Sequence, residues 1–122
     1  MSTTAEFVDR YTAVWNESDA GRRLKLITEL WAEDGRYTNA EREFRGHAQV
    51  EAAVREAYDD FIVKGFTFKT HEFHEVQDAV RLVWHMVPAG GTDVVAVGTE
   101  FIVRGADGTI RIDYQFMDVN PA

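Results

Sequence analysis

Hydrophobic residues recur at helical spacing in the first half of the chain. An amphipathic helix is predicted over about residues 4–16 by four such positions, Phe7, Tyr11, Val14 and Trp15. The polar run 16–19 breaks it and offers an N-cap for a second helix over about residues 20–32. The third helix has the clearest apolar stripe, made of Val50, Ala53, Val54, Ala57, Tyr58, Phe61 and Ile62. Gly65 follows it where a C-terminal glycine is expected.

After Gly65 the hydrophobic period changes from helical to strand-like. Runs rich in Val, Ile, Phe and Thr cover residues 66–76, 79–87, 93–104 and 109–119, and hairpin-type turns separate them. Residues 36–39 are expected to form a short lone strand. Helices followed by a meander predict one α+β domain over residues 1–122. In this fold, three N-terminal helices pack in the concave face of a curved, mainly antiparallel sheet.

The hairpin turns suggest which strand residues share a face. A two-residue turn at 77–78 sets His71 opposite Trp84 and Phe73 opposite Leu82. Carrying the pairing onward adds to this inner face Val95, Val97, Thr99, Phe101, Asp113, Gln115 and Met117. The outer face then holds Val83, His85, Val94, Ile102, Ile112, Tyr114 and Phe116. Its apolar character predicts a homodimer through the outer face, although a one-residue slip would exchange the faces.

Charge and composition exclude several classes of function. The net charge of -8 argues against binding to nucleic acid or to an anionic membrane, which both need basic patches. The absence of cysteine excludes disulfides, zinc-thiolate sites and thiol nucleophiles. No apolar stretch is long enough for a membrane span, and residues 1–6 lack the features of a signal peptide. A cytoplasmic protein is therefore expected.

Polar residues on the expected inner face are the candidates for chemistry. Desolvation by apolar walls would raise the pKa of Asp113, which suits a general acid or base. The alternative is a structural Asp113 satisfied by His71, Gln115 or a backbone N–H. His71 is the second catalytic candidate, again against a purely structural role. Tyr37 and Asn39 point the same way on the short strand, where they could orient a carbonyl or a water, or form an ordinary strand-and-loop pair.

The remaining candidates belong to a substrate pocket. We expect it to be apolar and lined by Trp15, Tyr37, Trp84, Phe101 and Met117, with Thr99 and Gln115 on the same face. His71 and His74 are three apart on a strand, so they point to opposite faces and cannot chelate together. Since the chain has no cysteine and no His-x-x-x-His or Glu-x-x-His pair, no metal site is expected. No cofactor is expected either.

Several motifs resemble the nuclear transport factor 2-like superfamily and, within it, the SnoaL-like (polyketide cyclase-like) group. They are the stretches 11–16, 30–37, 44–50, 108–111 and 116–118. With their order and spacing, the resemblance extends over nearly the whole chain. The resemblance implies a cone of curved sheet closed by three helices and commonly dimeric through the sheet. Members include polyketide cyclases, ketosteroid isomerases, epoxide hydrolases and dehydratases, as well as non-catalytic domains, so the fold does not fix a function.

Comparison with the catalytic residues of these members limits the reactions that this chain could catalyse. The ketosteroid isomerases carry an Asp base at what looks like Asn39, and an amide cannot be that base. Limonene-type epoxide hydrolases have a Tyr-x-Asn that matches residues 37–39. These enzymes also use an Arg-x-Asp motif and a further Asp. The matching positions in this chain look to be residues 84–86 and Gln115, which do not carry those charged groups. The SnoaL-like cyclases use an acid–base Asp in the cavity, for which Asp113 is the nearest candidate.

Three functions are consistent with these features. The first is a small cofactor-free cyclase, isomerase or hydrolase, in which Asp113 moves a proton of a hydrophobic substrate and His71, or Tyr37 with Asn39, polarises an oxygen. The second is a dimeric domain that binds an apolar small molecule without chemistry. The third is a stand-alone protein-interaction module. The first two differ from the third in requiring a cavity between the helices and the inner sheet face.

Overall fold

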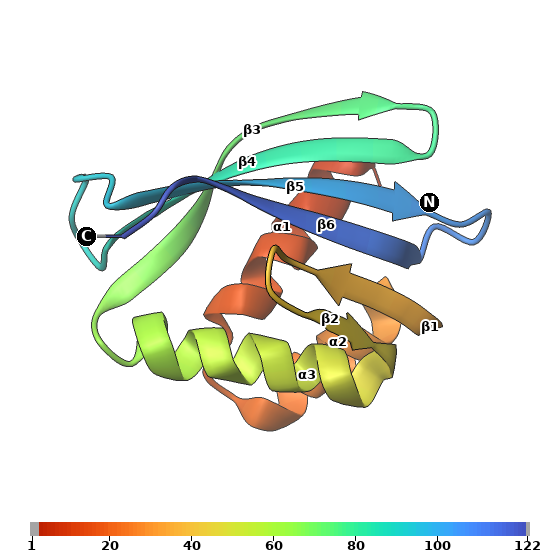
Figure 1. Cartoon of the computed structure of the whole chain (residues 1–122), viewed down its shortest axis with the longest axis horizontal. Coiled ribbons are helices and arrows are strands. Elements are labelled where there is room, and N and C mark those ends of the chain that lie inside the picture. The colour runs from red at the N-terminus through yellow and green to blue at the C-terminus, as the bar shows by residue number, and fades with distance from the viewer. Residues whose placement is uncertain (1–2, 122) are drawn as a thin grey trace.

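The computed structural model describes residues 3–121, which form helices packed against one curved sheet (Figure 1). The helices are α1 (Thr4–Asn16), α2 (Ala20–Leu30) and α3 (Gly46–Ala57), and a π-helical turn, η1 (Tyr58–Ile62), continues α3. The strands are β1 (Trp31–Thr38), β2 (Glu43–Arg45), β3 (Phe66–Val76), β4 (Ala79–Pro88), β5 (Ala96–Arg104) and β6 (Ile110–Val119). Within residues 3–121, no helix is long and apolar enough to cross a membrane.

The six strands form a single sheet in the order β2-β1-β6-β5-β4-β3. All neighbouring strands are antiparallel except β1 and β6, which run parallel. Register shifts interrupt three of these pairings, β1–β6, β3–β4 and β5–β6, and such bulges bend a sheet. The sheet is therefore curved but not closed, with β2 and β3 as its edges. This α+β cone confirms the predicted fold class.

Local sequence signals account for where the first two helices begin. Thr3 caps α1 through a capping box, in which its hydroxyl accepts from the backbone of Glu6 and the Glu6 side chain reaches back to the backbone of Thr3. Asp19 caps α2 by accepting a hydrogen bond from the Arg22 backbone N–H. Gly65 has a φ of 97°, which suits glycine alone, and it separates η1 from β3.

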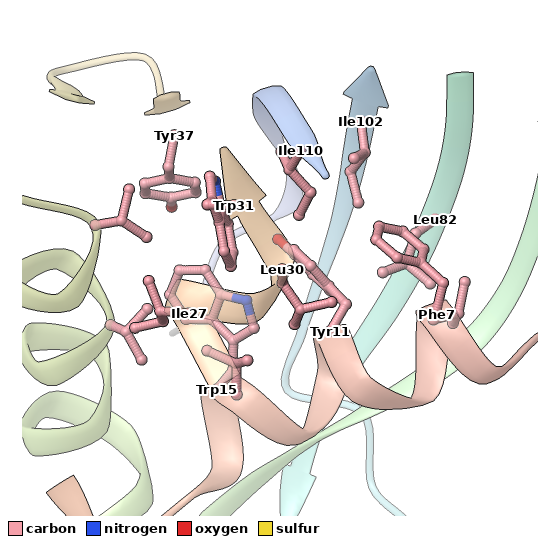
Figure 2. Packing of buried hydrophobic residues seen from close by; sticks show 14 of the residues in the cluster. Phe7, Tyr11, Trp15, Ile27, Leu30, Trp31, Tyr37, Leu82, Ile102 and Ile110 are labelled. Carbon is pink, nitrogen blue, oxygen red and sulfur yellow. The ribbon is translucent and has the colours of Figure 1, made fainter. Parts of the chain in front are cut away.

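The main core lies between the helices and the inner sheet face (Figure 2). Helix α1 contributes Phe7, Tyr11 and Trp15, whose side chains point from the helix toward the strands. Trp31 of β1 is 1% exposed, and its ring lies 5.7 Å from that of Tyr11. A smaller cluster, made of Trp84, Met86 and Ala96, packs with the half-buried Phe61, Phe66 and Phe68. The two clusters hold the helices against the concave side of the sheet.

Between α2 and α3, the structure differs from the elements predicted from the sequence. Helix α2 ends at Leu30, and the first strand begins at Trp31 instead of residue 36. The charged run 33–35, which resembles a helix end, instead lies in a stretch where the β1–β6 register shifts between Trp31 and Arg36. Strand β2 was not predicted at all. It pairs with β1 around a turn closed by Asn39, whose Oδ1 accepts from the backbone of Glu41 and Arg42.

Candidate functional site

A cavity of about 260 Å³ lies between α1, α3, η1 and the inner sheet face. Its buried walls are mostly aromatic and aliphatic, and they include Trp15, Tyr37, Leu82, Trp84 and Met86. Its outer end is formed by exposed residues, namely Arg42, Glu56, Asp60, Met117, Asn120 and Pro121. Apolar cavities with a few polar groups are the usual sites for small molecules.

Two buried carboxyl groups meet at one wall of this cavity. Glu100 of β5 is 1% exposed and lines the cavity, while Asp113 of β6 is fully buried behind it. The Tyr11 hydroxyl joins them, since it lies 3.1 Å from Glu100 Oε1 and also hydrogen-bonds Asp113 Oδ2. Glu100 Oε2 accepts a 2.7 Å hydrogen bond from the indole N–H of Trp84. The result is a chain of polar groups that runs from the cavity wall into the core.

This arrangement requires a proton on one of the carboxyls. A phenol carries one hydrogen, so Tyr11 donates to only one carboxyl and accepts from the other, which must be protonated. Burial raises the pKa of Glu100 well above its ordinary value, and the neighbouring Asp113 raises it further. Burial also raises the pKa of Asp113, to about 6. Both pKa shifts favour a pair that keeps a proton near neutral pH, and burial and the neighbouring Asp113 both favour Glu100 as the group that holds it.

The phenols in this region stay neutral. Burial raises the pKa of Tyr11 well above its ordinary value, and the neighbouring carboxyl groups of Asp113 and Glu100 add to that effect. Burial likewise raises the pKa of Tyr37. The Tyr37 hydroxyl donates a 2.7 Å hydrogen bond to Gln115 Oε1, so the amide nitrogen of Gln115 keeps its capacity to donate. The cavity wall thus combines a neutral acid with a phenol and an amide.

Charged residues at the outer end of the cavity form a polar rim. Arg42, in the β1–β2 turn, forms an ion pair with Glu56 of α3, and its guanidinium lies over the Phe44 ring. The exposed carboxylate of Asp60 lies on the η1 side of the same rim. Within residues 3–121, no three His, Asp or Glu side chains form a group that could hold a metal ion.

Comparison with known proteins places this geometry in a family. The model of the SnoaL-like domain matches residues 8–112. The chain belongs to the SnoaL-like family. No curated protein sequence matches it. Its fold resembles that of a candidate isomerase of the SnoaL-like family from Agrobacterium tumefaciens, with a TM-score of 0.84 and 28% identity over 93% of this chain and 96% of that chain.

More distant structures share the fold alone. A candidate polyketide cyclase from Sinorhizobium meliloti has a TM-score of 0.71 and is 14% identical over 91% of this chain and 94% of the other. A candidate ketosteroid isomerase from Kribbella flavida has a TM-score of 0.70 and is 18% identical over 98% of this chain and 80% of the other. Structures with this fold therefore include proteins described as isomerases and as cyclases.

The structure brings several of the expected site residues to the cavity of this SnoaL-like domain. Those that line it are Trp15, Tyr37, Asn39, Trp84, Gln115 and Met117. Asp113 lies on the inner face, as expected, but Glu100 and Tyr11 stand between it and the cavity. Asn39 is placed at the rim, where its side-chain oxygen holds the β1–β2 turn. The sequence therefore placed Asp113 on the inner face but missed Glu100, the carboxyl that lines the cavity.

The expected faces of β5 are wrong. Leu82 pairs with Glu100 and Trp84 with Gly98, so the even-numbered residues of β5, including Ile102, face inward. Thr99 and Phe101 consequently lie on the outer face, where Phe101 is 41% exposed and Thr99 hydrogen-bonds Asp118. The cause is the irregular connection between Pro88 and Ala96, which is longer than the expected turn and shifts the register by one residue.

His71 also lies on the wrong face for catalysis in the cavity. Thr70, rather than His71, pairs with Trp84, and the register shifts between Thr70 and Glu72. This bulge turns His71 outward, where its ring stacks on that of His85 at 4.1 Å. The expectation that His71 polarises a substrate oxygen beside Asp113 is therefore wrong.

Proposed function

We propose that this SnoaL-like domain is a small cofactor-independent enzyme of isomerase, cyclase or hydrolase type. It acts by acid–base catalysis on a hydrophobic small molecule held in the cavity. The proposal depends mainly on one observation. Glu100 is buried in the wall of an apolar cavity, and hydrogen bonds through the Tyr11 hydroxyl link it to a second carboxyl, Asp113. A carboxylic acid kept neutral by an apolar site can donate a hydrogen bond or a proton to a substrate oxygen.

Each residue of this wall has a distinct role in the proposed reaction. Glu100 exchanges a proton with the substrate, because it alone of the two carboxyls lines the cavity. Tyr11 and Asp113 act as positioning residues. The Tyr11 hydroxyl holds Glu100 in place, and the neighbouring Asp113 raises the pKa of Glu100, which favours its protonated form. Tyr37 and Gln115 offer a phenol and an amide that can bind a substrate oxygen.

A variant pair tests this assignment. Hydrophobic ketones, epoxides and polyketide-like compounds would be screened for turnover by the wild-type protein. Glu100→Gln should then lower kcat about 10²–10⁴-fold, the usual contribution of general acid–base catalysis. Asp60→Asn removes a carboxylate from the exposed rim of the same cavity and should change kcat little. Full turnover by a correctly folded Glu100→Gln protein would refute the proposal.

One observation favours a second candidate, a domain that binds an apolar ligand without chemistry. Both oxygens of Glu100 already have hydrogen-bond partners within the protein, Tyr11 and Trp84, so the acid is satisfied without a substrate. In that case, compounds from the screen should bind with no turnover. Glu100→Gln should then leave their affinity nearly unchanged, because an amide of the same shape fills the same place.

We also propose that the protein is a homodimer formed through the outer sheet face. Phe101, Tyr114 and Phe116 are 41%, 40% and 56% exposed, and they are neighbours on β5 and β6. Soluble monomers rarely expose a contiguous apolar patch of this kind. A second copy of the chain would cover the patch in a two-fold symmetric contact.

A further inference from the structure

A second depression, of about 260 Å³, lies on the sheet face opposite the cavity. It is lined by Asp34, Arg36, Arg45, Val103, Arg111 and Ile112. Arg36 and Ile112 pair with each other, and their chain neighbours Tyr37 and Asp113 point inward, so strand alternation places the depression outside the cone. Its residues belong to β1, β2, β5 and β6, which are four successive strands of the sheet (Figure 1).

Three arginines in one depression are unusual in a chain with a net charge of -8. Arg36 and Arg45 are direct partners on antiparallel strands, where like charges destabilise the pair. The Arg36 guanidinium is neutralised by Glu43 at 2.9 Å. Within residues 3–121, neither Arg45 nor Arg111 has an ion-pair partner within 4.0 Å. The depression is lined by these three guanidinium groups and by one carboxylate, that of Asp34, so positive charge is in excess among its lining residues.

The position of Arg45 is unfavourable for a second reason. It is the N-cap residue of α3, and its own side chain makes no capping hydrogen bond, although the Gln49 side chain accepts one from the Arg45 backbone N–H at 2.8 Å. The first turn of α3 contains no acidic residue, and the N-terminal end of a helix carries a partial positive charge. A cation at this end adds to the repulsion already present between Arg45 and Arg36. Local preferences that fail together in this way are expected at functional sites.

We infer that this depression binds an organic anion, one that carries a carboxylate or a phosphate group on an apolar body. The guanidinium groups of Arg45 and Arg111 suit both anionic groups, because their N–H donors match paired oxygens. The side chains of Val103 and Ile112 supply an apolar surface for the rest of the molecule. The inference does not depend on the proposed enzyme activity, since no residue of the acid pair belongs to the depression.

Titration of the full chain with phenyl phosphate, at an ionic strength held constant with sodium chloride, tests this inference. Isothermal calorimetry should show saturable binding, and amide shifts in NMR spectra should centre on Val103, Arg36 and Ile112. Arg45→Gln and Arg111→Gln should each weaken binding about tenfold or more, as expected for a lost charge-assisted hydrogen bond. Arg22→Gln makes the same change of charge on the exposed face of α2 and should alter the affinity less than twofold.

A variant expected to strengthen binding and three further ligands test the same inference. Glu43→Gln should strengthen binding, because it releases the Arg36 guanidinium from its ion pair. Benzoate should bind at the same residues, inorganic phosphate more weakly, and benzyl alcohol not at all, since it lacks the anionic group. The inference would be overturned by equal losses in Arg45→Gln and Arg22→Gln, by shifts spread over the surface, or by no binding at millimolar phenyl phosphate.

Discussion

At the scale of single residues, the protonated carboxyl pair links stability to pH. Burial raises the pKa of Asp113 to about 6, so the folded protein binds this proton more tightly than the unfolded chain. The resulting stabilisation is fully present below the ordinary pKa of an aspartate, about 4. It is lost as the pH rises through about 6, and Glu100 extends the loss to higher pH. The free energy of unfolding should fall by on the order of 2–3 kcal/mol across the Asp113 window.

Urea denaturation at about pH 4.5 and pH 7.5 measures this effect. The wild-type protein should lose more stability on going to the higher pH than Asp113→Asn does, because the amide has no proton to release. Asp60→Asn, which changes an exposed carboxylate, should keep the wild-type dependence. If Asp113→Asn shows the same change with pH as the wild-type protein, the pKa of Asp113 is not raised in the folded state.

At the scale of elements, β1 depends on a close approach that only glycine permits. A Cβ placed on Gly35 would lie 2.6 Å from the carbonyl oxygen of Ile110, at the register shift between β1 and β6. Gly35→Ala should therefore destabilise the protein by about 1–3 kcal/mol, as overpacking does. Gly21→Ala in α2 is the control and should be neutral or slightly stabilising, since alanine favours helices. Equal thermal stability of both variants would contradict this account of β1.

The elements also show how far the sequence predicts the fold. Periodicity identified α1 and β3 with the bounds that the structure has, because each presents a regular pattern between clear breaks. It failed for β1 because the charged run 33–35 resembles a helix end. Pairing across a bulge depends on tertiary contacts that periodicity does not contain.

The candidate site was predicted only in part, for a related reason. The inner face of β6 was correct, whereas β5 was assigned with its faces exchanged, so Glu100 was missed. One signal was present in the sequence. Gly98 lies in mid-strand, and glycine there often marks a close approach. In the structure the Trp84 ring occupies the place of its side chain, at 2.1 Å from a Cβ. Placing Gly98 opposite Trp84 would have turned Glu100 inward.

At the scale of the whole molecule, the exposed outer sheet face predicts self-association. Light scattering at micromolar concentration should report twice the chain mass of 13.9 kDa. Tyr114→Glu places a charge in the middle of the apolar patch and should give a monomer that remains folded. Leu24→Glu changes a comparably exposed residue on α2, at 44%, and should leave the dimer intact. A wild-type protein that scatters as a monomer would contradict the proposed dimer.

The fold also places the two proposed binding regions on opposite faces of the sheet. The inner cavity contains the neutral acid, while the depression on the opposite face contains the arginines. Strands β1 and β6 form the wall between them, since neighbouring residues such as Arg36 and Tyr37 point to opposite sides. Variants of one region should therefore leave binding at the other nearly unchanged, which allows each proposal to be tested separately.

The protonation state of Glu100 tests the central claim most directly. Carbon-detected NMR of protein labelled in its Glu and Asp side-chain carboxyls would follow each group from about pH 3 to pH 9, with Glu100→Gln and Asp113→Asn assigning the two signals. The structure predicts that Asp113 titrates near pH 6 and that Glu100 stays protonated well above the ordinary range of a glutamate. If both carboxyls are ionised below about pH 5, the range of unperturbed groups, the cavity has no neutral acid and the proposed chemistry fails.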